Sequence, residues 1–552
     1  MADQDQQGQQ PATAQAPNSS VAARLTFEST SEFVAYSRGQ RHKINSVFHV
    51  QAPEYQGEEA ARGAVDIVAV IDVSGSMSGS KLDLAKATLE FLIKNLSQTD
   101  HMGLVVYHSD VSVAFPLTRM DAEGKRTATA ALSTLRAQRC TNLSGGLFKG
   151  IEMMQGRERS AASVSSVLLM TDGIANEGVR GPNLITATRQ LMGDNPSYSL
   201  YTFGYGSNHE EELLKDLSEV GNGMYYYIEN NDTIPESFGD CLGGLLSVVG
   251  QNVKVTITTQ NGAKITTLHT QRQHTVSSDR TRAEIQLGDI QAEEQRDLLV
   301  ELDIPPLELP QPDKNDRTTT TTTTTAAAVH NNDDDEDEDD EGDGDDVKPA
   351  SEKDAEKEEE QQEEKDTETA AKCDDDVKKP RPEDVGVPHV TYAAAVLEYV
   401  NVISAAFEKE TASLTLTRPA QAPPKAQPDK NVRRQVRRVE AANAMREALQ
   451  AARRGDFASA QANLTTTSAA MRTEAAADDY IQQLLTDMDE CQGNFSTPAA
   501  YNGAGRYKAT AMMQMHCNQR ASAPSTYTTA SRGVMRKKAK DSSVFSSFFK
   551  KK

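Results

Sequence analysis

At 552 residues, the chain is long enough for about two to four domains. Its negative mean hydropathy and a hydrophobic content of 37% indicate that much of it does not contribute to a folded core. It contains no run of about 18 apolar residues, so the sequence predicts no transmembrane helix. We also expect no nucleic acid among its partners.

The net charge of −23 comes mostly from one segment. Between Asn331 and Gly386 there are 27 Asp and Glu residues against 8 Lys and Arg residues, a local charge of −19. The rest of the chain carries about −4, which is ordinary for a globular surface.

The cysteines indicate a reducing compartment. Their odd number, their scatter and the lack of a CxxC pair argue for free thiols and against a RING, LIM or zinc-ribbon site. The N-terminus also lacks the charged and apolar regions of a signal peptide. We therefore expect a cytoplasmic protein, with the nucleus or a membrane surface as alternatives. The five cysteines are Cys140, Cys241, Cys373, Cys491 and Cys517.

The first part of the chain predicts strands after a disordered start. Residues 1–20 are rich in Gln, Ala and Pro and are expected to be disordered. Two short strand-like runs follow within 21–58, at Ala23–Phe27 and Ile44–Gln51. We assign them to the beginning of a β-sandwich.

Residues 59–250 alternate between strand and helix patterns. Continuous apolar strands between helices predict an α/β fold with a mainly parallel sheet and helices on both faces. The expected strands are Val65–Ile71, Gly103–Tyr107, Val111–Pro116, Val164–Met170, Ser199–Gly204 and Gly223–Ile228. The expected helices are Leu82–Leu96, Ala122–Leu135, Gly145–Met154, Asn183–Met192, Glu210–Val220 and Ile234–Val248.

Beyond residue 250 the apolar period changes to two. Residues 251–309 and 388–419 alternate as antiparallel strands do, the second stretch as a hairpin. We infer that both complete the β-sandwich begun by residues 21–58. The α/β domain would then be inserted in that sandwich, as domains with adjacent termini allow.

Low-complexity and helical segments make up the remainder. Residues 310–387, Thr-rich and then acidic, are predicted to be a disordered insertion that acts as a spacer, a docking tail for basic proteins or a cation buffer. After a Pro-rich linker at 420–430, residues 431–525 predict α-helices that pack against one another or against the sandwich.

Residues 526–552 form a basic and aromatic tail. From Arg532 onward it has eight Lys and Arg residues against one Asp, interleaved with Phe545, Phe548 and Phe549. This composition suits an anionic membrane surface, into which the rings would insert. We expect a plain solvated terminus, with membrane binding, nuclear import through Arg536–Lys540 and contact with the acidic insertion as the alternatives.

A group of oxygen-bearing side chains follows the predicted buried strands. Asp72, Ser74 and Ser76 stand at alternate positions after the first strand, and Asp172 follows the strand that ends near Met170. Open α/β sheets bind ligands at the carboxyl ends of their strands. Carboxylate and hydroxyl oxygens on such a turn suit a small hard cation.

The motif Asp72-x-Ser74-x-Ser76 resembles that of von Willebrand factor A (VWA) domains, whose metal-ion-dependent adhesion site also uses a Thr and an Asp from later loops. Thr141 and Asp172 match these two, in the expected order. The resemblance implies a Mg²⁺ site, with Mn²⁺ as a substitute. It also implies that Ser74 and Ser76 bind directly and that Asp72 and Asp172 act through waters. A Glu or Asp carboxylate from a protein partner would complete the shell.

The motif region allows three other interpretations. The segment from Gly75 to Lys81 partly matches a phosphate-binding P-loop, but its spacing is one residue short and Leu82 replaces the required Ser or Thr. A nucleophile elbow would need Ser where Met77 stands. The third alternative is a VWA fold whose site is vacant or purely structural.

A looser resemblance covers the rest of the body. The succession of VWA domain, β-rich region and helical segment is similar to cytosolic VWA proteins that include RING-type ubiquitin ligases. Here no cysteine precedes Cys140, so we expect no RING and no ligase activity from this chain. The sequence therefore predicts a non-enzymatic, Mg²⁺-dependent protein-binding module. An adaptor in a ubiquitin-ligase system and a peripheral membrane scaffold are the rival hypotheses.

Overall fold

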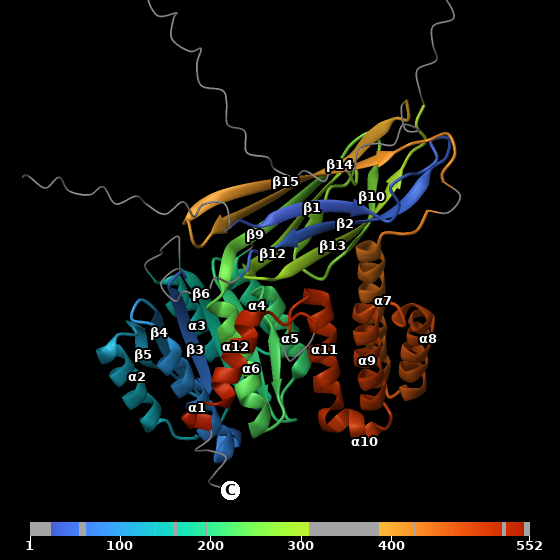
Figure 1. Ribbon diagram of the computed structural model, residues 1–552. Helices are drawn as coiled ribbons and strands as arrows, with labels where there is room; N and C mark the ends of the chain where they lie inside the picture. Colours follow the sequence, from blue (N-terminus) through green and yellow to red (C-terminus); the bar gives the residue numbers. More distant parts are fainter. Residues whose placement is uncertain are drawn as a thin grey trace, which may run out of the picture. The chain divides into compact units, whose positions relative to one another are not determined.

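The computed structural model describes residues 24–54, 62–138, 140–157, 163–193, 196–308, 386–423, 426–521 and 526–545 (Figure 1). The predicted disordered N-terminus (1–20) and nearly all of the predicted acidic insertion (310–387) lie outside these ranges. So do Phe548 and Phe549 of the predicted tail. Within the described ranges, no helix combines the length and apolar character that crossing a membrane would require.

The α/β domain contains a six-stranded sheet that is parallel except for one edge strand. In spatial order its strands are β5 (Val111–Arg119), β4 (His101–Tyr107), β3 (Val65–Asp72), β6 (Val164–Thr171), β7 (Ser199–Tyr205) and β8 (Tyr225–Ile228). Only β5 runs antiparallel to its neighbour, β4. Every residue of β3 and β6 is buried, because helices cover both faces of the sheet.

The helices divide between two separate cores. Those packed on one face are α1 (Ser80–Asn95), α2 (Ala122–Thr134) and α6 (Ile234–Leu245). Those packed on the other are α3 (Leu143–Gln155), α4 (Gly181–Met192) and α5 (Glu211–Val220). Side chains alternate along β3 between these cores, so that Ile67 belongs to the first and Val68 to the second. The predicted α/β architecture is confirmed.

Two antiparallel sheets form the β-sandwich. The first contains β1 (Thr26–Ser31), β2 (His42–Gln51), β13 (Gln295–Ile304) and β10 (Lys264–His269). The second contains β11 (His274–Val276), β12 (Arg282–Gln291), β9 (Val248–Thr259), β14 (His389–Asn401) and β15 (Ala406–Thr417). Strand β2 precedes the α/β domain and pairs with β13 beyond it, so the domain is inserted in the sandwich as predicted.

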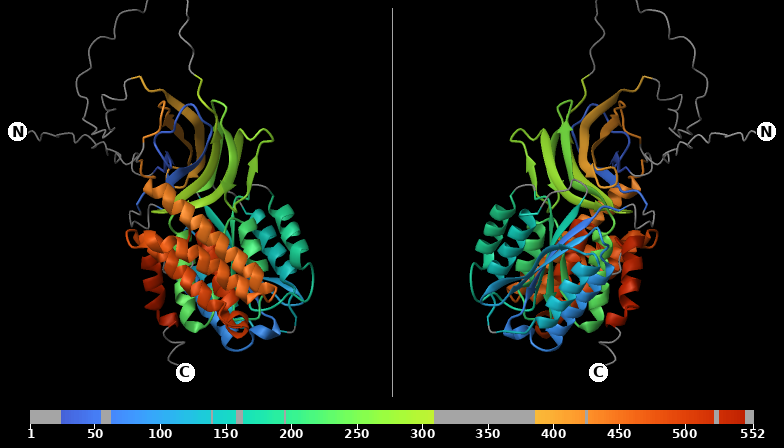
Figure 2. Two further views of the ribbon diagram at one scale, coloured as in Figure 1. Left: turned by 90° about the vertical axis from the view of Figure 1, so that its right-hand side faces the viewer. Right: turned by 90° about the vertical axis from the view of Figure 1, so that its left-hand side faces the viewer.

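The C-terminal helices have a core of their own, rich in Ala, Leu and Met. They are α7 (Lys430–Arg453), α8 (Phe457–Ala475), α9 (Asp479–Asn494) and α11 (Arg506–Asn518), drawn in orange and red in Figure 2. Aspartates cap α7, α8 and α9; Asp456, for example, accepts a hydrogen bond from the amide of Ser459 at 3.0 Å. Helix α11 also contacts the α/β domain, which the sequence did not predict. The side chain of Gln514 accepts a hydrogen bond of 2.8 Å from the amide of Tyr225.

The last described segment corrects the prediction of a free basic tail. Residues Ala530–Lys540 form helix α12, which packs against α6 of the α/β domain. Arg532 donates to Asp240 at 2.8 Å, and Arg536 donates to the other oxygen of the same carboxylate. Phe545 is 1% exposed and its ring lies 5.4 Å from that of Phe91, so it is not available to a membrane.

Two glycines allow α12 to approach α6 closely. A Cβ atom on Gly239 would lie 2.7 Å from the Cα atom of Arg536. One on Gly243 would lie 2.9 Å from the Cα atom of Arg532. These distances are shorter than non-bonded carbon atoms tolerate, so the packing depends on glycine at both positions. The close approach brings both arginines to Asp240, which is fully buried.

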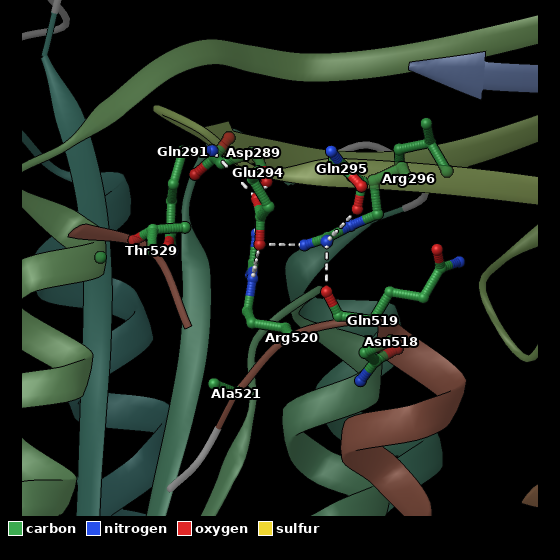
Figure 3. Close-up of polar contacts among 12 residues, drawn as sticks. Asp289, Gln291, Glu294, Gln295, Arg296, Asn518, Gln519, Arg520, Ala521 and Thr529 are labelled. Atoms are coloured by element: carbon green, nitrogen blue, oxygen red, sulfur yellow. Dashed lines mark hydrogen bonds and ion pairs between the residues drawn. The ribbon is translucent and has the colours of Figure 1, made fainter. Parts of the chain in front are cut away.

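A second buried ionic cluster connects the sandwich to the segment between α11 and α12 (Figure 3). Glu294, in the turn between β12 and β13, accepts hydrogen bonds from Arg520 at 2.7 and 3.0 Å and forms an ion pair with Arg296. Burial alone would raise the pKa of Glu294, but the two guanidinium groups lower it below its ordinary range. Arg520 also donates to the carbonyl of Asp289 at 2.6 Å. The C-terminal segment is therefore fixed by charge-assisted bonds.

The two acidic residues of α6 that form ion pairs with α12 give a matched test of burial. Replacing Asp240 with Ala leaves two buried guanidinium groups without their counter-charge, which costs about 3–5 kcal/mol. Replacing Glu236 with Ala removes a surface pair with Lys540, worth about 0–1 kcal/mol. Urea denaturation of the full chain measures both. Equal losses in the two variants would contradict the assignment of Asp240 as the anchor of α12.

Candidate metal site

The candidate site lies at the carboxyl ends of β3 and β6, which are neighbours in the sheet. Asp72 is the last residue of β3, and Asp172 follows the last residue of β6. Thr171 donates a hydrogen bond of 2.8 Å from its hydroxyl to Oδ2 of Asp72, which links the two strand ends. Parallel pairing thus brings together two aspartates that are 100 positions apart in the sequence.

The loop after β3 positions the two serines. The backbone amide of Ser74 donates to Oδ1 of Asp72 at 2.7 Å, which turns the chain back over the strand end. The hydroxyls of Ser74 and Ser76 lie 3.0 Å apart, and Ser76 donates to Oδ1 of Asp172 at 2.7 Å. Four of the five predicted ligands are therefore joined by one continuous series of hydrogen bonds.

The fifth predicted ligand, Thr141, comes from the loop before α3. Its amide donates to the side chain of Asn176 at 2.9 Å, and its carbonyl accepts from the amide of Glu177 at 3.2 Å. Gly173 lies between Thr141 and the serine loop. A Cβ atom at Gly173 would be 3.4 Å from Oγ of Ser76 and 3.8 Å from Oγ1 of Thr141. The structure thus brings all five predicted residues to the same edge of the sheet.

Burial dominates the electrostatics of the site. Asp72 and Asp172 are both fully buried, whereas Ser76 is exposed and opens the site to solvent. Burial raises the pKa of Asp72 to about 6; hydrogen bonds from Ser74 and Thr171 oppose this effect, and the charge of Asp172 adds to it. Asp172 forms an ion pair with the ammonium group of Lys81. The lysine thus pairs with one of the two carboxylates.

The side chains present fit a hard divalent cation. Two carboxylates and three hydroxyls offer only oxygen donors, which Mg²⁺ and Mn²⁺ prefer over nitrogen or sulfur. In the part of the chain that the structure describes, no group of three or more His, Cys, Asp and Glu residues suggests another metal site.

The structure adds three residues that the sequence analysis did not assign to the site. Thr171 and Asn176 hold ligand residues by hydrogen bonds, and Lys81 pairs with Asp172. The only signal for Lys81 was its place in the incomplete P-loop pattern, where it would have faced a phosphate. His101 lies at the start of β4, where its Nδ1 is 3.1 Å from Oδ1 of Asp66 in β3.

Comparison with protein families supports the domain assignment. A family model described as "von Willebrand factor type A domain" matches residues 66–240. This range contains the whole six-stranded sheet apart from the first residue of β3, together with all five candidate ligands. The chain therefore contains a VWA domain, a fold that generally mediates protein interactions.

Individual relatives are distant. The E3 ubiquitin-protein ligase WAV3 of Arabidopsis thaliana is 30% identical over 252 residues, which are 45% of this chain and 32% of that protein. The uncharacterized protein YfbK of Escherichia coli K12 is 30% identical over 196 residues, 35% of this chain and 33% of that protein. The chain thus spans about a third of the length of these curated relatives.

Among solved structures, a von Willebrand factor type A protein from Catenulispora acidiphila matches with a TM-score of 0.57 at 14% identity. The match covers 84% of this chain and 90% of that one. At this identity the likeness concerns the fold alone. It extends well beyond the VWA domain, into the sandwich and the helical region.

The raised pKa of Asp72 predicts a pH-dependent effect in Asp72→Asn. The folded protein holds this proton up to about pH 6, whereas an unfolded Asp releases it near 3.8. The stability contributed at this site therefore falls as pH rises from about 4 to 6. In EDTA, Asp72→Asn should gain about 3 kcal/mol over the wild type at pH 7.5, and most of this gain should be lost near pH 4.

Urea denaturation at both pH values measures this difference. Glu90→Gln, which removes an exposed carboxylate from α1, should show no such gain. A variant Asp72→Asn that is less stable than the wild type at pH 7.5 in EDTA would contradict the prediction.

Proposed function

We propose that this chain is a non-enzymatic protein-binding module that captures a partner carboxylate through a divalent cation on its VWA domain. The observation that carries this proposal is the convergence of Asp72, Ser74, Ser76, Thr141 and Asp172 at one edge of the sheet. Hydroxyls from two loops surround two buried carboxylates there, and one side of the group is open to solvent.

The neutral and the charged candidate ligands would have different roles. The hydroxyls of Ser74, Ser76 and Thr141 would hold the ion directly, and the buried carboxylates would balance its charge through waters. Mg²⁺ held mainly by neutral oxygens supplies an electrophilic position that a carboxylate from another protein can fill. Recognition of this kind needs neither a nucleophile nor a general base.

The hydrogen bonds of the serines favour binding over catalysis. Those of Ser74 and Ser76 within the described residues lead to each other and to the two aspartates. An activated serine would instead donate to a base such as histidine. We therefore propose no enzymatic activity for this site.

The rim of the site offers an apolar contact beside the charged centre. Ile174 is 57% exposed and Val179 is 39% exposed, and both lie in the loop that begins at Asp172. Exposed aliphatic side chains next to a binding site commonly contact a partner. We propose that the partner presents an acidic side chain with an aliphatic residue near it.

The four cysteines that the structure describes are unpaired. This supports our proposal that the module acts in a reducing compartment such as the cytoplasm.

A second candidate function is that of an adaptor in a ubiquitin-ligase system. It is favoured by the similarity to WAV3, which covers 45% of this chain. Ligase activity that copurifies with the full chain and is lost on deletion of the VWA loop residues would favour this candidate. Purified complexes of the chain with its partners that show no ligase activity would argue against this candidate.

Calorimetric titration of the full chain with Mn²⁺ tests the proposed metal site. Ser74→Ala removes a hydroxyl that would bind the ion, so we expect Mn²⁺ affinity to fall by about tenfold or more. Ser78→Ala is the matched control, because Ser78 lies in the same loop but is exposed and outside the motif. Equal Mn²⁺ affinity in the wild type and Ser74→Ala would place the ion elsewhere and contradict the proposal.

A further inference from the structure

Lys81 is a positively charged side chain at the candidate metal site. It is the second residue of α1, its side chain is 31% exposed, and its ammonium group pairs with Oδ2 of Asp172. The other oxygen of that carboxylate accepts the hydroxyl of Ser76. Asp172 is therefore shared between the lysine and the serine loop.

The fold holds Lys81 in this position from two sides. Helix α1 begins after Gly79, whose φ of 78° is in the left-handed region, and side chains at the start of a helix point back beyond its N-terminus. The aliphatic part of Lys81 then passes the loop after β7. There, a Cβ atom on Gly206 would lie 3.8 Å from Cε of the lysine, which is ordinary van der Waals contact.

Lys81 changes the formal charge of the site. The two aspartates give the site a charge of −2, and Lys81 brings it to −1. With a divalent cation the site would carry +1, which a single carboxylate neutralises. Without the lysine, the loaded site would be neutral before any partner arrived, and it would attract a carboxylate less strongly.

We propose that Lys81 weakens the binding of the divalent cation to the metal site and strengthens the capture of one carboxylate by the cation-loaded site. This inference rests on the proposed function, since it assumes a cation held by the five candidate ligands. Both effects follow from Coulomb's law, because the ammonium group repels the incoming cation and attracts the incoming anion at the same short range. Pairing with Asp172 further weakens cation binding, because Lys81 must release or share that carboxylate when the cation binds.

Lys81→Met tests the inference because it removes the charge and keeps most of the apolar side chain. We expect Mn²⁺ to bind about tenfold more tightly to the variant in calorimetry, as the loss of one unit charge at close range allows. We expect acetate to bind about threefold more weakly to the Mn²⁺-loaded variant. Paramagnetic relaxation of the acetate methyl protons by the protein-bound Mn²⁺ measures this second affinity.

Two further variants serve as controls. Lys81→Arg keeps the charge and should keep both affinities near those of the wild type. Lys94→Met removes a lysine that lies on the same helix, is 54% exposed and pairs with Glu90. It should change neither affinity. If circular dichroism shows that Lys81→Met does not fold, Lys81→Gln carries the same two expectations.

The opposite signs of the two effects make the outcomes distinct. Tighter Mn²⁺ binding together with weaker acetate binding supports the inference. Unchanged or weaker Mn²⁺ binding, or unchanged or stronger acetate binding, overturns it. A wild-type chain that binds no Mn²⁺ would overturn the proposed function itself, whereas a wild type that binds Mn²⁺ and is unaffected by Lys81→Met would overturn only the role of the lysine.

Discussion

The described architecture depends on buried carboxylates that form ion pairs with arginines. Asp240 in the VWA domain and Glu294 in the sandwich are both almost completely inaccessible, and each meets two guanidinium groups. Such pairs contribute little net stability, but an unpaired member is very costly. The C-terminal segment supplies Arg520, Arg532 and Arg536 and thereby satisfies charges in two different domains.

The metal site shows the opposite arrangement. Asp72 is as deeply buried as Asp240, yet it is held by hydroxyl and amide donors instead of arginines. Burial raises the pKa of Asp72, and the hydrogen bonds from Ser74 and Thr171 oppose this effect. The same chain therefore contains buried acids that arginines neutralise and a buried acid that accepts hydrogen bonds from hydroxyl and amide groups. This contrast separates the structural ion pairs from the candidate binding site.

Much of the fold could be predicted from sequence periodicity. The continuous apolar runs at Val65–Ile71 and Val164–Met170 are strands buried on both faces, and period-two stretches far apart in sequence do share the sandwich sheets. The five candidate ligands could be named because Asp72, Ser74 and Ser76 resemble the VWA motif and Thr141 and Asp172 match its two later positions. Whether they hold a metal stays a prediction.

What the sequence could not predict depends on contacts between distant residues. A Lys, Arg and Phe pattern at the end of the chain is typical of a free tail, and nothing local to Arg532 or Phe545 indicates a partner some 300 or 450 positions earlier. Only the buried Asp240 and the glycines of α6 explain why this segment packs. Lys81 was missed for a similar reason, since its partner Asp172 comes from another loop.

The packing of α12 on α6 also determines which residues make up the complete VWA domain. A domain bounded by residues 59 and 250 in the sequence would, if excised there, expose Phe91 and leave Asp240 without its arginines. Its physical boundary therefore includes a helix encoded almost 300 residues downstream. An isolated fragment of residues 59–250 would therefore lack the helix that packs on α6 and the arginines that neutralise Asp240.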